Sequence, residues 1–365
     1  MRKLILSPCG TSLLTNGSNE IERKLVNKHA NANEIHDAND KKLLEERIRT
    51  VREKLLSCSF EEAKKLSAEL NGIISLYNGL IPKEASQDYY ILLCTDTWLG
   101  EQTALLVESW LKKQNLTTEV RRQKDLQTNN LESFQVALSD LVQWCEEVIK
   151  GYKDSQYYVI FNLTGGFKSV QGFLQTLALF YADESVYIFE TGNELLRIPR
   201  LPVKMAEVDY IRQNLAAFRR LSLELSDKSD STEKIPETFL LEIDGEKTLS
   251  AWGEIVWHSA KKEIYKDCVY ESPINKVRFS QKFLKSVENL ETDRCVLVNQ
   301  KVDQLCKYLQ TKQNVSSLDF KELKGNPKPP STHEIDAWSD KDAKRIFCHY
   351  ENGILVLDEL GKGFH

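Results

Sequence analysis

Two loops carry the side chains best suited to hold a phosphate. Each follows a short apolar run typical of a β-strand, residues 3–6 in one case and 157–161 in the other. Glycines let backbone N–H groups approach a ligand, hydroxyls and amides supply hydrogen bonds, and a lysine supplies a point charge. These types predict a site for a phosphate-bearing ligand. The candidate residues are Gly10, Thr11, Ser12, Asn162, Thr164, Gly165, Gly166 and Lys168.

A third loop, with Asp96 and Thr97, follows the apolar run 88–94. Loops at the carboxyl ends of parallel strands line the ligand crevice of an open α/β sheet, so we expect all three loops at one edge. A P-loop is excluded because the chain has no GxxxxGK[ST] sequence. The structural alternative is that Gly165-Gly166 only turns the chain and Thr164 caps the next helix.

The elements that position these loops alternate between strand and helix. Over residues 1–205 this pattern predicts a Rossmann-like, doubly wound α/β domain. We expect strands at 3–6, 88–94, 118–121, 157–161 and 186–189, and helices at 101–113, 134–148 and 168–181. The polar stretch between the first two strands predicts one or two exposed helices, one of them begun by a capping box at Ser59 and Glu62.

The sequence after residue 205 predicts two smaller segments. Residues 206–272 predict a short, mostly helical connector or a winged helix. Residues 273–365 predict a small α+β domain with strands at 332–337, 344–350 and 354–360. The last two strands form a hairpin, because Asn352-Gly353 is typical of a tight turn.

Length, net charge and cysteine content exclude several classes of protein. A chain of 365 residues suggests more than one domain, and a net charge of −5 excludes a broad basic field for capturing nucleic acid. No apolar run reaches the roughly 20 residues that cross a bilayer, so no membrane partner is expected. The eight cysteines form no CxxC pair and predict no metal site, and the simplest location is the cytoplasm.

The N-terminal pattern resembles a CARF domain, the Rossmann-like sensor of type III CRISPR defence. Gly10-Thr11-Ser12, Thr95-Asp96-Thr97 and the strand–NLTGGFK–helix unit carry the likeness over residues 1–205. The resemblance implies a homodimer that binds one cyclic oligoadenylate, most simply cyclic tetra-adenylate, across its two-fold axis, with no other cofactor. It assigns the three loops to that ligand.

The C-terminal pattern is similar to the RelE/HigB family of mRNA interferases. The sequences LKG and KRIFCHYENGILVLDELGKGFH carry this likeness over residues 273–365. It implies a metal-independent endoribonuclease that cuts messenger RNA on the ribosome, by attack of a ribose 2′-hydroxyl on the adjacent phosphate.

The same resemblance assigns roles to residues. Arg345 would stabilise the phosphate, Lys362 would match a basic position near the family's C-terminus, His365 would be general acid or base, and Lys324 would contact RNA. His349 and His333 are alternatives for proton transfer. Where the family has a lysine-rich strand, this chain has His333-Glu334-Ile335-Asp336-Ala337. A carboxylate base, Glu334 or Asp336, is therefore a further alternative.

Other functions remain open. A transcriptional regulator would use Trp252, Trp257 and the helix predicted at 251–266 to bind DNA. A ring nuclease would degrade its own ligand with Thr11 and Lys168. The Arg23-to-His29 spacing of a HEPN ribonuclease lies in the N-terminal insertion and is interpreted as chance. Residues 244–247 lack the order of a restriction-type nuclease, so a metal-dependent nuclease is not expected.

Overall fold

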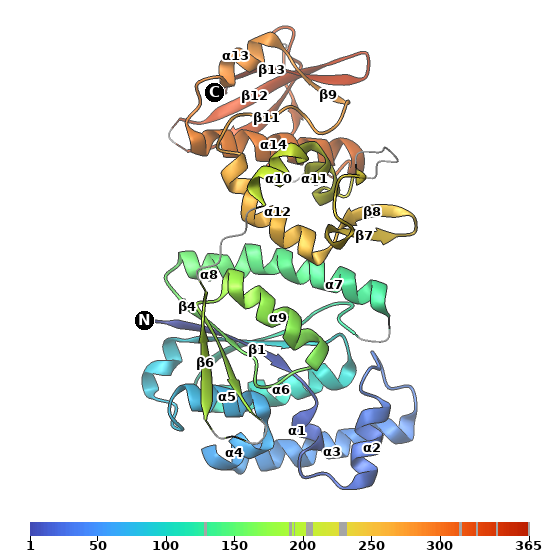
Figure 1. The fold of residues 1–365 in the computed structure, drawn as a ribbon, viewed down its shortest axis with the longest axis vertical. Helices are drawn as coiled ribbons and strands as arrows, with labels where there is room; N and C mark the ends of the chain where they lie inside the picture. Colours follow the sequence, from blue (N-terminus) through green and yellow to red (C-terminus); the bar gives the residue numbers. More distant parts are fainter. Residues whose placement is uncertain are drawn as a thin grey trace. The chain divides into compact units, whose positions relative to one another are not determined.

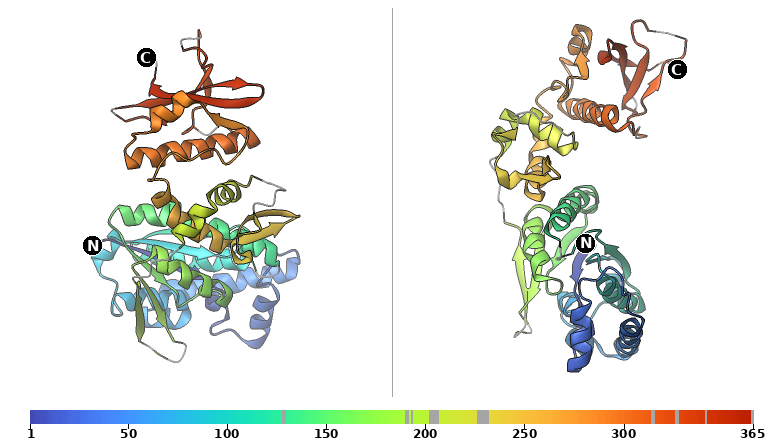
Figure 2. Two further views of the ribbon diagram at one scale, coloured as in Figure 1. Left: turned by 45° about the horizontal axis from the view of Figure 1, so that its top comes forward. Right: turned by 90° about the vertical axis from the view of Figure 1, so that its right-hand side faces the viewer.

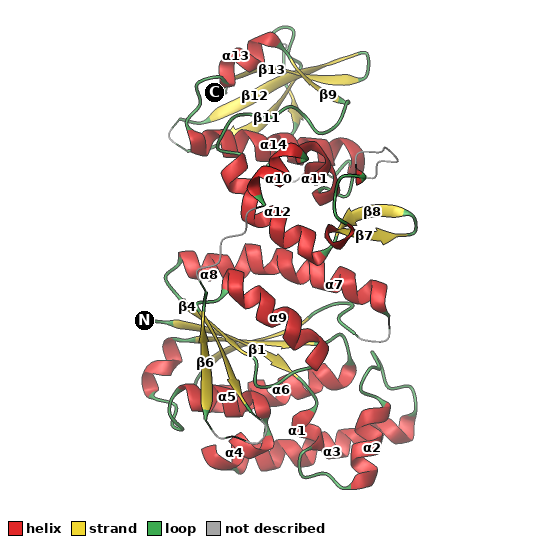
Figure 3. Cartoon of the chain, in the orientation of Figure 1, coloured by secondary structure: helices red, strands yellow, loops and turns green. Residues whose placement is uncertain are grey.

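The structure is a computed structural model that describes residues 1–127, 130–189, 192, 194–201, 207–225, 232–313, 316–325, 328–340 and 342–363. The chain divides into two compact units, Met1–Val203 and Lys204–His365. Each unit combines a sheet with helices (Figures 1 and 3). Among the described residues, no helix is both long and apolar enough to cross a membrane.

A six-stranded sheet of order β3-β2-β1-β4-β5-β6 forms the centre of the N-terminal unit. Its first five strands are parallel and the last is an antiparallel edge strand, which the sequence did not predict. The strands are β1 (Lys3–Cys9), β2 (Tyr89–Cys94), β3 (Thr117–Arg122), β4 (Tyr158–Asn162), β5 (Glu184–Ile188) and β6 (Leu195–Pro199). The predicted parallel α/β core is confirmed, because apolar runs such as Leu4–Leu6 are buried on both faces.

Helices between these strands complete the unit (Figure 1). The predicted helices after β2 and β4 are confirmed as α6 (Trp98–Lys113) and α9 (Lys168–Tyr181). The predicted helix at 134–148 is α7 (Leu131–Trp144), which continues through a π-turn, Cys145–Ile149, into α8 (Lys150–Asp154).

The insertion between β1 and β2 differs from the prediction of one or two exposed helices. It holds five: α1 (Ser12–Thr15), α2 (Glu20–Lys28), α3 (Ala38–Ser57), α4 (Phe60–Leu66) and α5 (Ala68–Leu76). The capping box of Ser59 with Glu62 is present at the start of α4. Helix α5 is buried over most of its length because it is almost entirely apolar or small, and Ile73 and Ile74 join the main core.

The C-terminal unit begins with α10 (Val208–Gln213), α11 (Leu215–Ser222), the hairpin β7 (Leu240–Ile243) and β8 (Glu246–Leu249), and α12 (Ala251–Ile264). The hairpin follows α11 and precedes α12, the helix that the DNA-binding alternative would use. Trp257 of α12 is buried in an aromatic core with Phe218, and Trp252 is 42% exposed.

A five-stranded sheet of order β10-β11-β12-β13-β9 forms the rest of this unit. Its strands are β9 (Val277–Phe279), β10 (Lys321–Glu322), β11 (His333–Trp338), β12 (Lys344–Glu351) and β13 (Ile354–Lys362). The predicted hairpin is confirmed, since Asn352 and Gly353 turn it with φ values of 50° and 80°. Helices α13 (Gln281–Val287) and α14 (Thr292–Thr311) accompany this sheet (Figure 2), and α14 packs on the face that holds Ile335 and Ile346.

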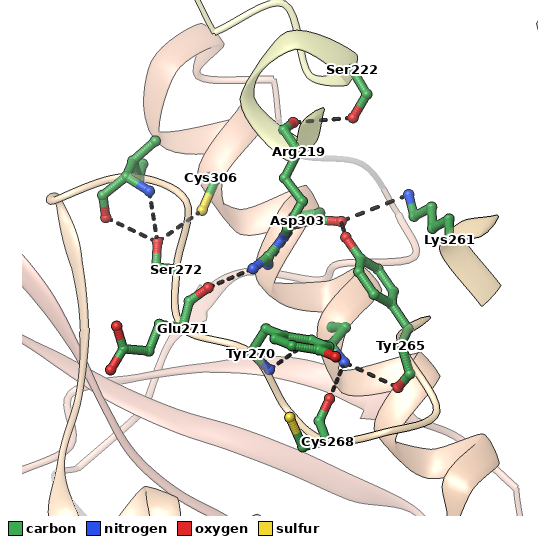
Figure 4. Close-up of polar contacts among 12 residues, drawn as sticks. Arg219, Ser222, Lys261, Tyr265, Cys268, Tyr270, Glu271, Ser272, Asp303 and Cys306 are labelled. Atoms are coloured by element: carbon green, nitrogen blue, oxygen red, sulfur yellow. Dashed lines mark hydrogen bonds and ion pairs between the residues drawn. The ribbon is translucent and has the colours of Figure 1, made fainter. Parts of the chain in front are cut away.

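A buried ion pair joins the first part of this unit to α14 (Figure 4). Arg219 of α11 donates to Asp303 of α14 at 2.8 Å, and both side chains are at most 4% exposed. Tyr265 donates to the same carboxylate at 2.5 Å, and Lys261 lies 3.7 Å from it. This ion pair therefore links residues on the two sides of the boundary expected near residue 273.

Candidate functional site

The three glycine- and hydroxyl-bearing loops emerge at one edge of the N-terminal sheet. Strand β1 lies between β2 and β4 and runs parallel to both, so their carboxyl ends lie together. The loop after β1 carries Gly10, the loop after β2 carries Thr95 to Thr97, and the loop after β4 carries Leu163 to Phe167. The topology thus brings the candidate ligand loops to one place.

Gly10 and Gly166 pack directly against each other. A Cβ on Gly10 would lie 3.3 Å from the Cα of Gly166, and a Cβ on Gly166 would lie 2.8 Å from the Cβ of Pro8. Gly166 also has a φ of +99°, which a side chain disfavours. A side chain is therefore excluded at Gly166, and at Gly10 it would require the neighbouring backbone to shift by a few tenths of an ångström.

A buried carboxylate from the insertion holds these loops. Glu69 of α5 is completely buried and accepts hydrogen bonds from the backbone N–H of Gly10 at 2.9 Å, from Ser67 at 2.7 Å and from the N–H of Gly166. Burial raises the pKa of Glu69, and the hydrogen bonds from Gly10 and Ser67 oppose that shift. Glu69 therefore occupies the backbone anion cradle that the glycines form.

Asn162 and Gly165 lie beside this carboxylate rather than on an open surface. The buried amide of Asn162 donates to the Ser7 hydroxyl and to the Glu69 carbonyl, each at 3.0 Å. A Cβ on Gly165 would lie 2.4 Å from the Glu69 carboxylate. Asn162 therefore helps to hold the loop after β4 in place, and Gly165 leaves the space that the Glu69 carboxylate occupies.

Two hydroxyls at this edge have no hydrogen-bond partner among the described residues. The Ser12 Oγ and the Thr164 Oγ1 are inaccessible and unpaired. Thr11 is half-buried at the start of α1 and makes no side-chain cap, while Lys168 is exposed at the start of α9. Hydroxyls, an ammonium and a helix start together can bind the oxygens of a phosphate or a ribose.

The loop after β4 is also held from its own helix. The side-chain amide of Gln171 in α9 donates to the carbonyl of Leu163 at 3.1 Å and to that of Gly165 at 2.8 Å. Two carbonyls of the turn are thereby satisfied, which fixes the turn against α9.

In the third loop, which follows β2, the candidate side chains bond to other residues of the N-terminal unit. Asp96 accepts from Arg122 at 2.8 Å and from the backbone N–H of Asp125 at 2.9 Å. Thr97 is 1% exposed and caps α6 by accepting from the N–H of Gly100. Both side chains serve the local fold, so in this structure neither presents a free group to a ligand.

The C-terminal candidates lie mainly on one face of the second sheet. Ile346 and Cys348 of β12 point into the core, so Arg345, Phe347 and His349 point to the opposite face. Arg345 is paired with Asp336, directly opposite on β11, and with Asp319 at 3.1 Å. The guanidinium expected to stabilise a phosphate is thus held by two carboxylates.

His349 has a different partner. Its Nδ1 lies 2.9 Å and 3.0 Å from the two carboxylate oxygens of Asp358 on β13. Asp358 is 7% exposed and also accepts from the Ser331 hydroxyl at 2.7 Å. No described residue hydrogen-bonds the Nε2 of His349, so this nitrogen can exchange a proton with a substrate.

The remaining C-terminal candidates lie elsewhere. His333 stacks on Phe320 and contacts the Thr332 hydroxyl, and Glu334 lies 3.6 Å from Lys321. Lys324 and Lys362 are exposed. No contact among the described residues joins either lysine to Arg345 or His349. His365 lies outside the described residues.

Three residues that hold these sites, Glu69, Gln171 and Asp358, are not among those predicted from the sequence. Glu69 is the one charged residue of the segment AELNGIISL, and Asp358 lies beside Glu359 in the mostly apolar segment ILVLDEL. A carboxylate in such a segment can be carried into the interior with its apolar neighbours and must then find donors there, which was the available signal. Gln171 gave no such signal, because a polar residue near the start of a helix is ordinary.

Part of the N-terminal unit matches a known family. Residues 64–201 match the family described as CRISPR-associated protein (Cas_APE2256). No curated protein matches the sequence. Among solved structures, Csm6 of Enterococcus italicus bound to cyclic hexa-2′-fluoro-hexa-dAMP is similar, with 13% sequence identity and a TM-score of 0.29. That similarity covers 60% of this chain, and this chain spans 46% of that one.

The family match begins in α4 and ends just beyond β6. It includes Glu69 and the loops after β2 and β4, while Gly10, Thr11 and Ser12 precede it. The part of the N-terminal unit that holds two of the three candidate loops is therefore similar to a CRISPR-associated protein family.

Proposed function

We propose that this chain is a type III CRISPR ancillary effector whose N-terminal unit binds a cyclic oligoadenylate. The unpaired, buried hydroxyls of Ser12 and Thr164, at the sheet edge where Gly10 meets Gly166, carry the proposal. Buried hydroxyls without partners are costly, and a ligand with ribose and phosphate oxygens removes that cost. The family match over residues 64–201 supports the CRISPR context.

The loops also suggest how such a ligand is held. Glu69 already satisfies the N–H groups of Gly10 and Gly166, so ligand oxygens meet side chains: Ser12, Thr164, Thr11 and the exposed Lys168. Two copies of the chain related by a two-fold axis would present two such sets to one ring. A homodimer with cyclic tetra-adenylate is the simplest assembly of this kind.

The C-terminal unit is proposed to be the effector, an endoribonuclease that cuts messenger RNA on the ribosome. Its sheet face carries Arg345 and His349, a cation and a proton-transfer group of the kinds that phosphodiester cleavage requires. Ligand binding can control this activity only if the ligand binds the active state more tightly than the inactive one.

The test uses the purified full chain, ribosomes programmed with labelled mRNA, and cyclic tetra-adenylate, with controls that omit the ligand or the ribosome. Cleavage that needs both is the expected result. Cleavage of free RNA would replace the ribosome-dependent enzyme with a conventional ribonuclease. Consumption of the ring without RNA cleavage would favour a ring nuclease, and intact RNA and ligand would favour the DNA-binding regulator.

A further inference from the structure

We propose that Asp336 and Asp319 position Arg345 so that the Nε–Nη2 edge of its guanidinium faces an RNA phosphate, and that Gly363 leaves room for that phosphate. This inference rests on the proposed ribonuclease function. It names two positioning residues and one residue that controls access to the arginine. These four residues are called the arginine clamp below.

Both carboxylates hold Arg345 by the same nitrogen. Its Nη1 donates to the Asp319 carboxylate at 3.1 Å and also forms the ion pair with Asp336. Among the described residues, no other acceptor bonds this guanidinium, and the side chain is 27% exposed. The Nε–Nη2 edge, whose two N–H groups can bind two oxygens of one phosphate, is therefore held in place without being occupied.

The sheet and one buried leucine fix the two carboxylates. Asp336 lies directly opposite Arg345 on the neighbouring strand β11. The backbone N–H of Asp336 donates to the carbonyl of Leu318 at 2.9 Å, and the Leu318 side chain is completely buried. Asp319 follows Leu318 directly in the chain, so the same anchor brings the second carboxylate to Arg345.

Gly363, the residue after β13, leaves space beside the Nε–Nη2 edge. A Cβ on Gly363 would lie 3.3 Å from the Cγ of Arg345 and 3.5 Å from its Nε, so even the smallest side chain would touch the arginine. Gly363 has no positive φ, so its backbone conformation does not require a glycine. Its lack of a side chain therefore matters through the space that it leaves at Nε.

Other cations accompany the two carboxylates at this end of the sheet. The Lys321 ammonium lies 2.5 Å from the Asp319 carboxylate, and Lys321, with Arg345, lowers the pKa of Asp319, which is therefore charged at neutral pH. Lys344 and Lys362 lie opposite each other, one residue along the strands from Arg345. Asp319 and Asp336 are thus not isolated negative charges, and their contribution to the clamp is the direction in which they hold the guanidinium.

An RNA phosphodiester suits this edge of the guanidinium. Each phosphodiester has two non-bridging oxygens, and Nε–H and Nη2–H are two parallel donors that can bind both of them. Because Asp336 and Asp319 already restrict the guanidinium, less conformational entropy is lost when the phosphate binds. The same contact offsets the negative charge that builds up on these oxygens during cleavage.

The experiment measures kcat/KM for cleavage of labelled mRNA by the full chain, with cyclic tetra-adenylate and ribosomes. R345A should lower kcat/KM about 100-fold. R345K should restore little of it, because an ammonium cannot form two parallel bonds to one phosphate. D336N and G363V should each lower kcat/KM about tenfold. R278A is the matched control, because Arg278 belongs to the same sheet and forms an exposed ion pair with Glu351 outside the clamp.

A double-variant test separates positioning from a structural role. In an R345A background, D336N and G363V should have no further effect on kcat/KM, because both act through the arginine. Urea unfolding of the single variants shows whether they fold. Their unfolding midpoints should lie close to that of the wild type, because ion pairs on a solvated face add little stability.

The outcomes separate the two proposals. If R345A cleaves as well as the wild type, the arginine clamp has no part in the reaction, while the ribonuclease function stands. If R345K keeps full activity, the two-point contact is wrong. If D336N or G363V lowers kcat/KM equally with and without Arg345, that residue does not act through the arginine; either variant decides this if the other does not fold. If the wild type binds its ligand but cleaves no RNA, the proposed ribonuclease function fails and the inference fails with it.

Discussion

The carboxylate of Glu69 accepts a hydrogen bond from the backbone N–H of Gly10 at 2.9 Å, in the interior of the N-terminal unit. This contact joins the inserted helix α5 to the end of the central strand β1. The same carboxylate also accepts from Gly166, so one side chain sets the spacing of the two loops that carry the candidate ligand groups.

The pH dependence of stability should report on Glu69. A carboxyl whose pKa is raised by folding binds its proton more tightly in the folded state, so folding gains stability as the pH falls through the raised pKa toward the ordinary value of 4.5. The difference in unfolding free energy between the wild type and E69Q should therefore grow in favour of the wild type as the pH is lowered. Urea unfolding at several pH values measures it.

E62Q is the control, because its effect on the unfolding free energy should depend on pH in the opposite direction. Hydrogen bonds from the backbone N–H and side chain of Ser59 lower the pKa of Glu62, so its contribution is present above pH 4.5 and is lost as the pH falls through the lowered value. If lowering the pH changes the difference in unfolding free energy from the wild type in the same direction for E69Q and E62Q, the inference that burial raises the pKa of Glu69 is wrong.

Gly166→Ala should disrupt the ligand loop. The new methyl group would lie 2.8 Å from the Pro8 Cβ at a backbone φ of +99°, so we expect a loss of about 1–3 kcal/mol in unfolding free energy, with weaker ligand binding. Gly172→Ala is the control, because its Cβ would meet nothing within 4 Å in helix α9. That variant should be more stable by about 0.5–1 kcal/mol. Chemical denaturation of both variants tests this, and equal stability would refute the close approach.

Thr164→Val should weaken ligand binding without lowering stability. Its hydroxyl has no hydrogen-bond partner among the residues that the structure describes, so replacing it with a methyl group removes an unsatisfied buried oxygen. A ligand that accepts or donates to this hydroxyl should lose about tenfold in affinity. Calorimetric titration with cyclic tetra-adenylate measures the loss. Thr176→Val, on the same helix as Lys168, removes a hydroxyl bonded only to the Gly172 carbonyl and should leave affinity unchanged.

The Arg219–Asp303 pair should show strong coupling. Arg219→Met leaves a buried carboxylate without its main cation, and Asp303→Leu leaves a buried guanidinium without its carboxylate, so each should cost about 3–5 kcal/mol. The double variant removes both charges and should be less destabilised than the sum of the two single variants. A double-mutant cycle in urea measures the coupling, and simple additivity would contradict the buried pair.

The amino-acid sequence by itself determined the parallel α/β core, several of the helices and the C-terminal hairpin. These depend on local patterns: apolar runs such as Tyr89–Cys94, the Ser59 capping box, and Asn352-Gly353, whose positive φ values suit a tight turn. The sequence also identified the loops that hold Gly10, Thr164 and Gly166. Their common position follows from strand order, which the α/β pattern implies.

Only the tertiary structure decided which polar groups are already occupied. Glu69 and Gly10 are 59 residues apart, and Arg219 and Asp303 are 84 apart, so no local pattern could pair them. The same holds for Asp96 with Arg122 and for Arg345 with Asp336, whose side chains looked available in the sequence. A polar side chain must be paired once its surroundings exclude water, and its partner depends on how distant segments pack.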